Sequence, residues 1–204
     1  MRFLLFFFAG ACFAQHIGIG VKAAIAVTTD IEGYGASESR RYVVGPMIEV
    51  RLPFGFRVEA DALYRRFGYS TTSEFLSLAS FVTRARANSW EFPIMAKYRW
   101  RLPYVMAGVA PRYVSGEFVS SGFNTNPSTG VRSFSSSTGN LDFATQVGFV
   151  AGGGVEFGLG RIHVAPEVRY IRWKDPLLSD YGSRGYYLLV PQNEVQILVG
   201  LTWR

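Results

Sequence analysis

The sequence predicts an all-β protein: an eight-stranded antiparallel up-and-down transmembrane β-barrel with short periplasmic turns and long extracellular loops. First, eight segments alternate apolar and polar residues with a period of two, the pattern of a β-strand with two unlike faces. Second, the connections between these segments alternate long and short. Third, no apolar run of about 18 residues follows the N-terminal region, so no transmembrane helix is expected.

The stretch 90–113 shows this pattern most clearly. One face of its first half is aromatic at both ends and aliphatic in the middle: Trp90, Phe92, Ile94, Ala96, Tyr98 and Trp100. The opposite face carries Glu91, Lys97 and Arg99. Trp and Tyr favour the two membrane–water interfaces, so the apolar face suits a strand that meets lipid. The charged face excludes a dry apolar core, and an amphipathic strand of a soluble protein is the alternative.

The first four predicted strands separate outward from inward residues. Strand 17–27 places Ile and Val outward and Gly, Ala and Lys inward. Strands 42–52 and 56–66 flank a tight turn at Pro53 and place their acids and most of their arginines inward. Strand 90–100 is the one described above.

The last four predicted strands continue the alternation. Strand 104–114 places Val and Ala outward with Arg112 inward, and strand 142–157 places several glycines inward. Strand 161–173 alternates Ile, Val and Tyr with Arg, His and Glu, and strand 194–203 alternates Val, Ile, Leu and Trp with polar residues. Each strand offers about ten alternating residues, the length that a tilted strand needs to cross the hydrocarbon.

The connections predict which end of the barrel is which. The short connections centre on Pro53, Leu102 and Leu159, and the long ones are 28–41, 69–88, 115–141 and 174–191. Outer-membrane barrels have short periplasmic turns and longer extracellular loops, and an even strand count puts both termini on the periplasmic side. Segment 115–141 is dominated by Ser, Thr, Asn and Gly, so we expect weak order with local extension of the flanking strands.

Charged residues occupy the alternate positions of these strands that are expected to face inward. The predicted lumen set is Lys22, Glu49, Arg51, Arg57, Glu59, Asp61, Arg65, Glu91, Lys97, Arg99, Arg112, Glu156, Glu167, Arg169 and Glu194. An eight-stranded barrel is just wide enough for side chains to fill it. We therefore expect a network of paired charges that plugs the lumen, with a proton or ion path through the network as the alternative.

Aromatic residues fall at the ends of the outward faces. The predicted membrane-interface set is Tyr42, Tyr64, Trp90, Tyr98, Trp100, Tyr113, Tyr170 and Trp203. Their amphipathic rings suit the headgroup level, so outer-membrane lipid is a predicted partner of this wall.

Other chemistry receives little support from the sequence. The formal net charge is +6, but the basic residues are spread singly along strands, so nucleic-acid binding is not favoured. Gly18-Ile19-Gly20 and Gly152-Gly153-Gly154 lie inside strands, which is not the context of a nucleotide loop. His16 and His163 are the only histidines, and no metal-ligand cluster stands out, so we expect no catalytic, cofactor or metal site. Glu59 and Asp61 share a face, but the arginines that flank them favour ion pairing.

The N-terminus predicts a cleaved signal peptide, 1–14, followed by one domain, 15–204. Arg2 supplies a positive n-region and residues 3–13 an apolar h-region. Cys12-Phe13-Ala14 provides small residues for cleavage before Gln15, and lipidation of Cys12 is the alternative. Because Cys12 is the only cysteine, the mature chain would lack disulfides.

Several stretches resemble the small outer-membrane β-barrel domain of porin-family proteins, of OmpA/OmpX type. They are Gly20-Val21-Lys22, 56–64, 90–98, 103–108, 152–157 and 167–170. The resemblance implies an outer-membrane location and a barrel, without an agreed activity, and it implies the barrel-assembly machinery as a partner during insertion.

The expected function is structural or surface interaction, with an unidentified extracellular ligand at the four long loops. A narrow porin-like channel and a lipid-modifying barrel enzyme are the first alternatives. A soluble lipocalin-like carrier is the third, but its cavity would be lined by apolar groups.

Overall fold

The computed structural model describes residues 17–28, 36–75, 78–142, 145–174, 177–181, 186–190 and 192–204. The strands are β1 (Ile17–Ala26), β2 (Ala36–Ser37), β3 (Tyr42–Arg51), β4 (Phe56–Asp61), β5 (Leu63–Phe75), β6 (Ala79–Glu91), β7 (Ile94–Arg99), β8 (Pro103–Thr125), β9 (Arg132–Asp142), β10 (Gln146–Val155), β11 (Phe157–Leu159), β12 (Ile162–Trp173), β13 (Leu177–Tyr181), β14 (Tyr186–Val190) and β15 (Asn193–Trp203). A short 3-10 helix, η2 (Pro53–Gly55), joins β3 to β4. Within these ranges, no helix combines the length and apolar character needed to cross a membrane. The predicted signal peptide, 1–14, lies outside the described residues.

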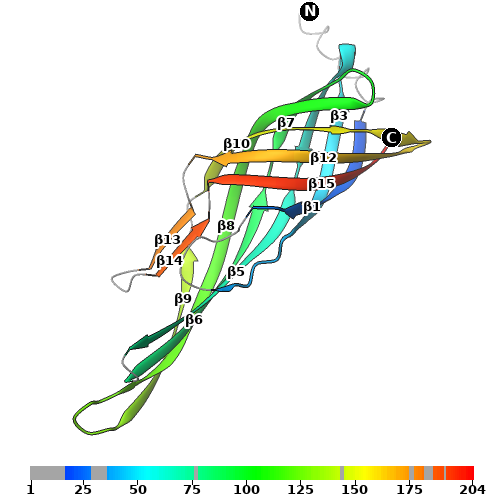
Figure 1. The fold of residues 1–204 in the computed structure, drawn as a ribbon. Helices are drawn as coiled ribbons and strands as arrows, with labels where there is room; N and C mark the ends of the chain where they lie inside the picture. Colours follow the sequence, from blue (N-terminus) through cyan, green and yellow to red (C-terminus); the bar gives the residue numbers. More distant parts are fainter. Residues whose placement is uncertain are drawn as a thin grey trace, which may run out of the picture.

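The strands close into an antiparallel eight-stranded barrel, so the predicted fold is confirmed (Figure 1). Strands β4 and β5 are consecutive pieces of one barrel strand, and so are β6 and β7. Around the wall, the eight barrel strands are therefore β1, β3, β4–β5, β6–β7, β8, β10, β12 and β15. The ring closes where β15 pairs with β1, from Ile19 opposite Trp203 to Ala26 opposite Gln196. A closed wall leaves no unpaired strand edge for lipid to meet.

The two faces of the wall differ as the alternation predicted. On β1, the Val21 side chain is 53% exposed, whereas the next side chain, Lys22, is 1% exposed. The same contrast appears on β15, where Ile197 is 53% exposed and Leu198 is fully buried. The apolar side chains therefore cover the outside of the barrel, and the charged ones fill its inside.

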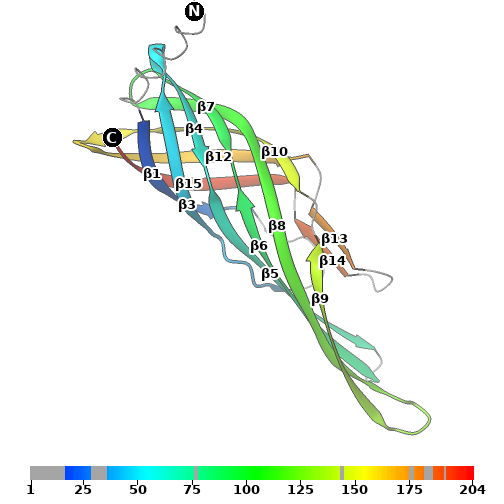
Figure 2. The same cartoon turned by 180° about the vertical axis from the view of Figure 1, so that it is seen from behind.

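Strands β5, β6, β8 and β9 continue as a sheet beyond one end of the barrel (Figure 2). The β5–β6 ladder runs from Leu63 opposite Glu91 to Phe75 opposite Ala79. Strand β8 pairs with β9 out to Thr125 opposite Arg132. The expectation of loops at 69–88 and 115–141 is therefore wrong over most of their length. We call residues 66–75 of β5, 79–88 of β6 and 114–125 of β8, together with β9, the outer sheet.

The outer sheet is ordered by contacts between distant segments of the chain. Its inner face carries a buried cluster of Phe67, Tyr69, Ala85, Ala87, Val114 and Phe118. The backbone ladders satisfy the peptide groups, so a Ser- and Thr-rich outer face does not prevent strand formation. Two other expected loops also contain strands. Segment 174–191 contains β13 and β14, which pair with each other, and segment 28–41 contains β2, which pairs with β5.

The short turn at η2 depends on glycine. Gly55 has a φ of +83°, and a Cβ at this position would lie 2.4 Å from the carbonyl oxygen of Arg99. Only glycine accepts both the left-handed backbone and this close approach. The turn brings β3 and β4 together in register, with Arg51 opposite Arg57.

Candidate functional site: the charged lumen

The structure places the predicted lumen charges inside the barrel. Thirteen are buried: Lys22, Glu49, Arg57, Glu59, Asp61, Arg65, Glu91, Lys97, Arg112, Glu156, Glu167, Arg169 and Glu194. The other two, Arg51 and Arg99, are half-buried near the short turns. Taking the end at η2 as the lower end, the order of residues along β4 and β5 sorts these charges into lower, middle and upper layers.

The middle layer crosses the whole lumen. It consists of Lys22, Glu59, Asp61, Lys97, Tyr104, Glu167 and Arg169. Glu59 forms ion pairs with Lys22 and Lys97, and its Oε1 lies 3.0 Å from Arg169 Nη2. These partners come from β1, β7 and β12, so one carboxylate links three parts of the wall.

Arg169 completes the middle layer. Its Nη1 lies 2.7 Å from Asp61 Oδ2, and its Nη2 lies 2.6 Å from Glu167 Oε1. Glu167 also accepts hydrogen bonds from Lys22 Nζ at 2.8 Å and from the Tyr104 hydroxyl at 2.7 Å. The layer holds three cations and three carboxylates, so its formal charge is zero. The attraction between these paired charges offsets the cost of removing them from water.

The upper layer surrounds Glu194. It consists of Arg65, Phe67, Glu91, Arg112, Trp173, Glu194 and Gln196. Arg112 Nη2 lies 2.8 Å from Glu91 Oε1 and 2.7 Å from Glu194 Oε2, and Arg65 forms a further ion pair with Glu194. The Arg112 guanidinium also lies over the indole of Trp173, with Cζ 3.4 Å from the ring centroid. Ion pairs and a cation–π contact together fill this part of the lumen.

The lower layer lies at the mouth beside the short turns and gathers around Glu156. It consists of Glu49, Arg51, Arg57, Arg99, Glu156, His163 and Arg204. Glu156 Oε1 lies 3.0 Å from Arg99 Nη1 and 2.9 Å from His163 Nδ1. Arg57 and Arg204 each pair with both Glu49 and Glu156. Arginines outnumber carboxylates in this layer, so the lower mouth carries a positive charge.

Some lumen residues were missed by the sequence analysis. Tyr104 and Trp173 are buried aromatic residues, and their residue type alone favours the membrane interface. Both fall on alternate strand positions that face inward, and this spacing is the signal that could have placed them in the lumen. Arg204 follows the last predicted strand, so its pairing across the mouth depends on the closed shape of the barrel.

The predicted interface aromatics lie on the outside of the wall. Tyr64, Trp90 and Tyr113 are opposite one another on neighbouring strands, and they form a row toward the outer sheet. Tyr42 and Tyr170 also lie toward that end. Three others lie toward the short turns: Tyr98, Trp100 and Trp203. Seven of the eight are exposed and Tyr64 is half-buried, so two aromatic levels flank the apolar band.

The described residues offer no cluster of three or more His, Cys, Asp or Glu side chains that suits a metal ion. His163 pairs with Glu156 at the lower mouth, where its Nδ1 lies 2.9 Å from the carboxylate. This contact joins β12 to the residue that follows β10 and serves the packing of the lower layer.

Comparisons with known proteins give a family and a set of similar shapes. The profile "Outer membrane protein beta-barrel domain" matches residues 13–172. Solved structures with a similar course include Ail, the attachment invasion locus protein of Yersinia pestis, in complex with the heparin analogue sucrose octasulfate, with 10% identity and a TM-score of 0.43. Neisserial surface protein A (NspA) has 12% identity and a TM-score of 0.36. Both matches cover 92% of this chain and 96% of the other chain. A search of curated proteins gave no match.

Proposed function

We propose that this chain, which belongs to the family of outer membrane protein β-barrel domains, is a non-conducting outer-membrane barrel that presents the outer sheet to the cell's surroundings. The observation that carries the proposal is the filled lumen. Three layers of side chains succeed one another between the two mouths, and ion pairs between non-adjacent strands cross the lumen in each layer.

The charge balance of the middle layer supports the absence of a current. Its three cations and three carboxylates are already paired with one another, so a passing ion has no free partner to replace its water shell. A narrow channel would need a continuous wet path past Arg169, which is fully buried. The soluble-carrier alternative is not favoured, because its apolar cavity would occupy the space that these charges fill.

Conductance across planar bilayers tests the proposal. The purified barrel should show no steady current, whereas E167A/R169A should conduct, because it empties the centre of the middle layer while keeping its charge balanced. The matched control is E38A/R84A, which removes an exposed pair whose closest atoms lie 4.0 Å apart. A steady ion-selective current through the unmodified barrel would contradict the proposal.

The surface role is supported by the outer sheet itself. Its hairpin tip, 126–131, is exposed, and the strands below it continue the barrel wall without a break. Because the mature chain is expected to lack cysteine, S128C provides a single labelling site at this tip. A membrane-impermeant maleimide should label S128C in intact cells and should not label F54C in the periplasmic turn. Labelling of F54C alone would reverse the proposed orientation.

A further inference from the structure

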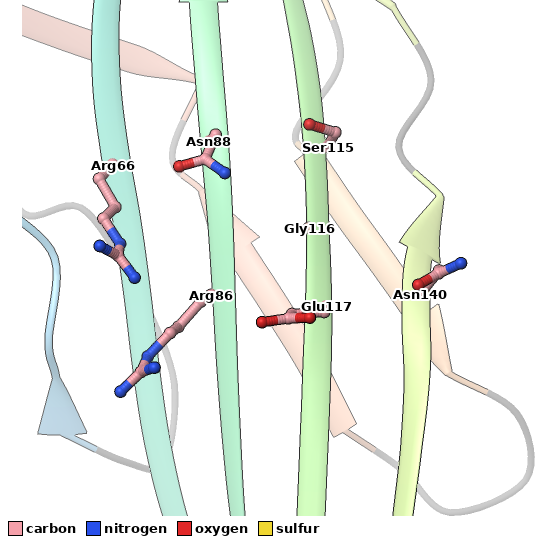
Figure 3. A pocket seen from close by; sticks show the side chains of 7 residues that line it. All are labelled: Arg66, Arg86, Asn88, Ser115, Gly116, Glu117 and Asn140. Atoms are coloured by element: carbon pink, nitrogen blue, oxygen red, sulfur yellow. The ribbon is translucent and has the colours of Figure 1, made fainter.

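A shallow groove lies on the outward face of the outer sheet, next to the aromatic row of Tyr64, Trp90 and Tyr113. It encloses about 490 Å³. The lining residues that matter for its chemistry are Arg66, Arg86, Asn88, Ser115 and Glu117. These residues and Asn140 lie on β5, β6, β8 and β9, which pair in the order β5-β6-β8-β9. Figure 3 shows Arg66 level with Asn88, and Arg86 on the neighbouring strand level with Glu117.

The strand register sets the depth of this groove relative to the membrane. Arg66 is two residues beyond Tyr64 on β5, and Asn88 is two residues beyond Trp90 on β6. Two residues of a strand span about 7 Å, so the groove begins one step outside the aromatic row. Aromatic rows mark the headgroup level, and the groove therefore lies where lipid phosphates and sugars are found.

The groove is rich in arginine. A neighbouring hollow of about 350 Å³ shares Arg66 and Arg86 and adds Arg40. Arg84 lines a third hollow together with Arg86. Among the described side chains, neither Arg66 nor Arg86 forms an ion pair, whereas Arg84 lies 4.0 Å from Glu38. Four arginines against Glu38 and Glu117 leave this exposed face positively charged.

The arginines and the aromatic level form one continuous surface. The Arg40 guanidinium lies over the Tyr42 ring, with Cζ 5.9 Å from the centroid. The Tyr64 hydroxyl donates a hydrogen bond to Asn88 Oδ1 at 2.7 Å, which joins the row to the groove lining. Below this level the wall is apolar, with Ile94 and its cross-strand partner Val109 exposed. The surface thus offers apolar contact on one side and, on the other, the guanidinium groups of Arg66 and Arg86, which form no ion pair with the described side chains.

We propose that this groove binds the phosphate groups of a phosphorylated glycolipid of the outer leaflet, with the acyl chains against the wall below Tyr64. Arginine suits this role, because its planar guanidinium holds phosphate oxygens through two parallel hydrogen bonds. A membrane lipid is favoured over a soluble polyanion, because the cations adjoin the lipid-facing wall and do not lie at the exposed tip. The proposal rests on the orientation given under the proposed function.

Native mass spectrometry of the purified barrel in detergent, titrated with bisphosphorylated lipid A, tests this inference. The unmodified barrel should retain the lipid, and R66Q/R86Q should bind it about tenfold more weakly or worse, because each lost contact involves two charged groups. R101Q/R132Q removes the same charge from two exposed arginines away from the groove, and it should bind like the unmodified barrel. Dephosphorylated lipid A should bind as weakly as lipid A binds to R66Q/R86Q.

Three results would overturn the inference. The first is equal lipid A binding by R66Q/R86Q and the unmodified barrel, and the second is equal binding of phosphorylated and dephosphorylated lipid. The third is displacement of lipid A by an equal concentration of inorganic pyrophosphate, which would indicate a soluble polyanion site. The S128C labelling experiment checks orientation independently, so a failure of the lipid site is distinguishable from a failure of the proposed function.

Discussion

Replacing Glu59 by glutamine tests the energetic role of the middle layer. Glu59 pairs with Lys22, Lys97 and Arg169, and all four side chains are buried. In E59Q the layer keeps three cations but only two carboxylates, so one positive charge is left uncompensated. Removing one partner of a buried ion pair costs about 3–5 kcal/mol, and we expect E59Q to lower the free energy of unfolding by that amount.

The double variant E59Q/K97M separates lost charge balance from lost packing. It leaves two cations and two carboxylates, and methionine retains much of the volume of the Lys97 side chain. We expect its free energy of unfolding to lie within about 2 kcal/mol of the unmodified protein, closer than that of E59Q alone.

Denaturant titration in lipid vesicles, followed by the mobility difference between unheated and boiled samples, measures these free energies. The control is E74Q, which removes a carboxylate from an exposed position and should change stability by less than about 0.5 kcal/mol. The reasoning is refuted if E59Q matches E74Q, or if E59Q/K97M is no more stable than E59Q alone.

Three further predictions follow from the wall and its turns. V21R places a cation on the lipid face near the middle of β1 and should lower the free energy of unfolding in lipid vesicles by about 2–4 kcal/mol. V119R on the outer sheet should lower it by less than about 0.5 kcal/mol, and equal losses would contradict a lipid-facing β1. G55A should lower the free energy of unfolding by more than about 1 kcal/mol, because of its φ of +83° and the 2.4 Å approach to Arg99 O. Gly130 also has a positive φ, +68°, but nothing lies within 4 Å of it, so G130A carries the backbone cost alone and should be less destabilising than G55A in the same titration. Trypsin added to intact cells should cut after Arg132 near the exposed hairpin tip and leave Arg101 in the periplasmic turn uncut; peptide mapping that finds the reverse would invert the orientation.

The barrel wall was predictable because its two faces meet unlike environments. Val21 and Lys22 are neighbours in the chain, yet one faces outward and the other lies buried, and a period of two records that difference directly. The same rule assigned charges such as Glu59 and Arg169 to the lumen. The alternation shows which residues face the lumen, but it does not show which acid pairs with which base, because the partners lie on strands that are distant in the sequence.

The outer sheet was not predictable by the same means. Segments 69–88 and 115–141 carry many Ser, Thr and Gly residues, so their two faces contrast weakly. Their strands are fixed by ladders between distant segments and by the buried cluster that includes Phe67 and Phe118. Tertiary pairing of this kind overrides local composition. The arginine groove depends on the same pairing, because it brings Arg66 and Arg86 together on adjacent strands.

Site-specific quenching by lipid tests the central claim most directly, namely that the apolar flank meets the bilayer and the charges lie within. A fluorophore on V21C, I48C or V168C should be quenched by lipids brominated on their acyl chains and should resist aqueous iodide. A fluorophore on S128C should show the opposite behaviour. Quenching of the three wall positions by iodide, with no effect of brominated lipid, would contradict the account.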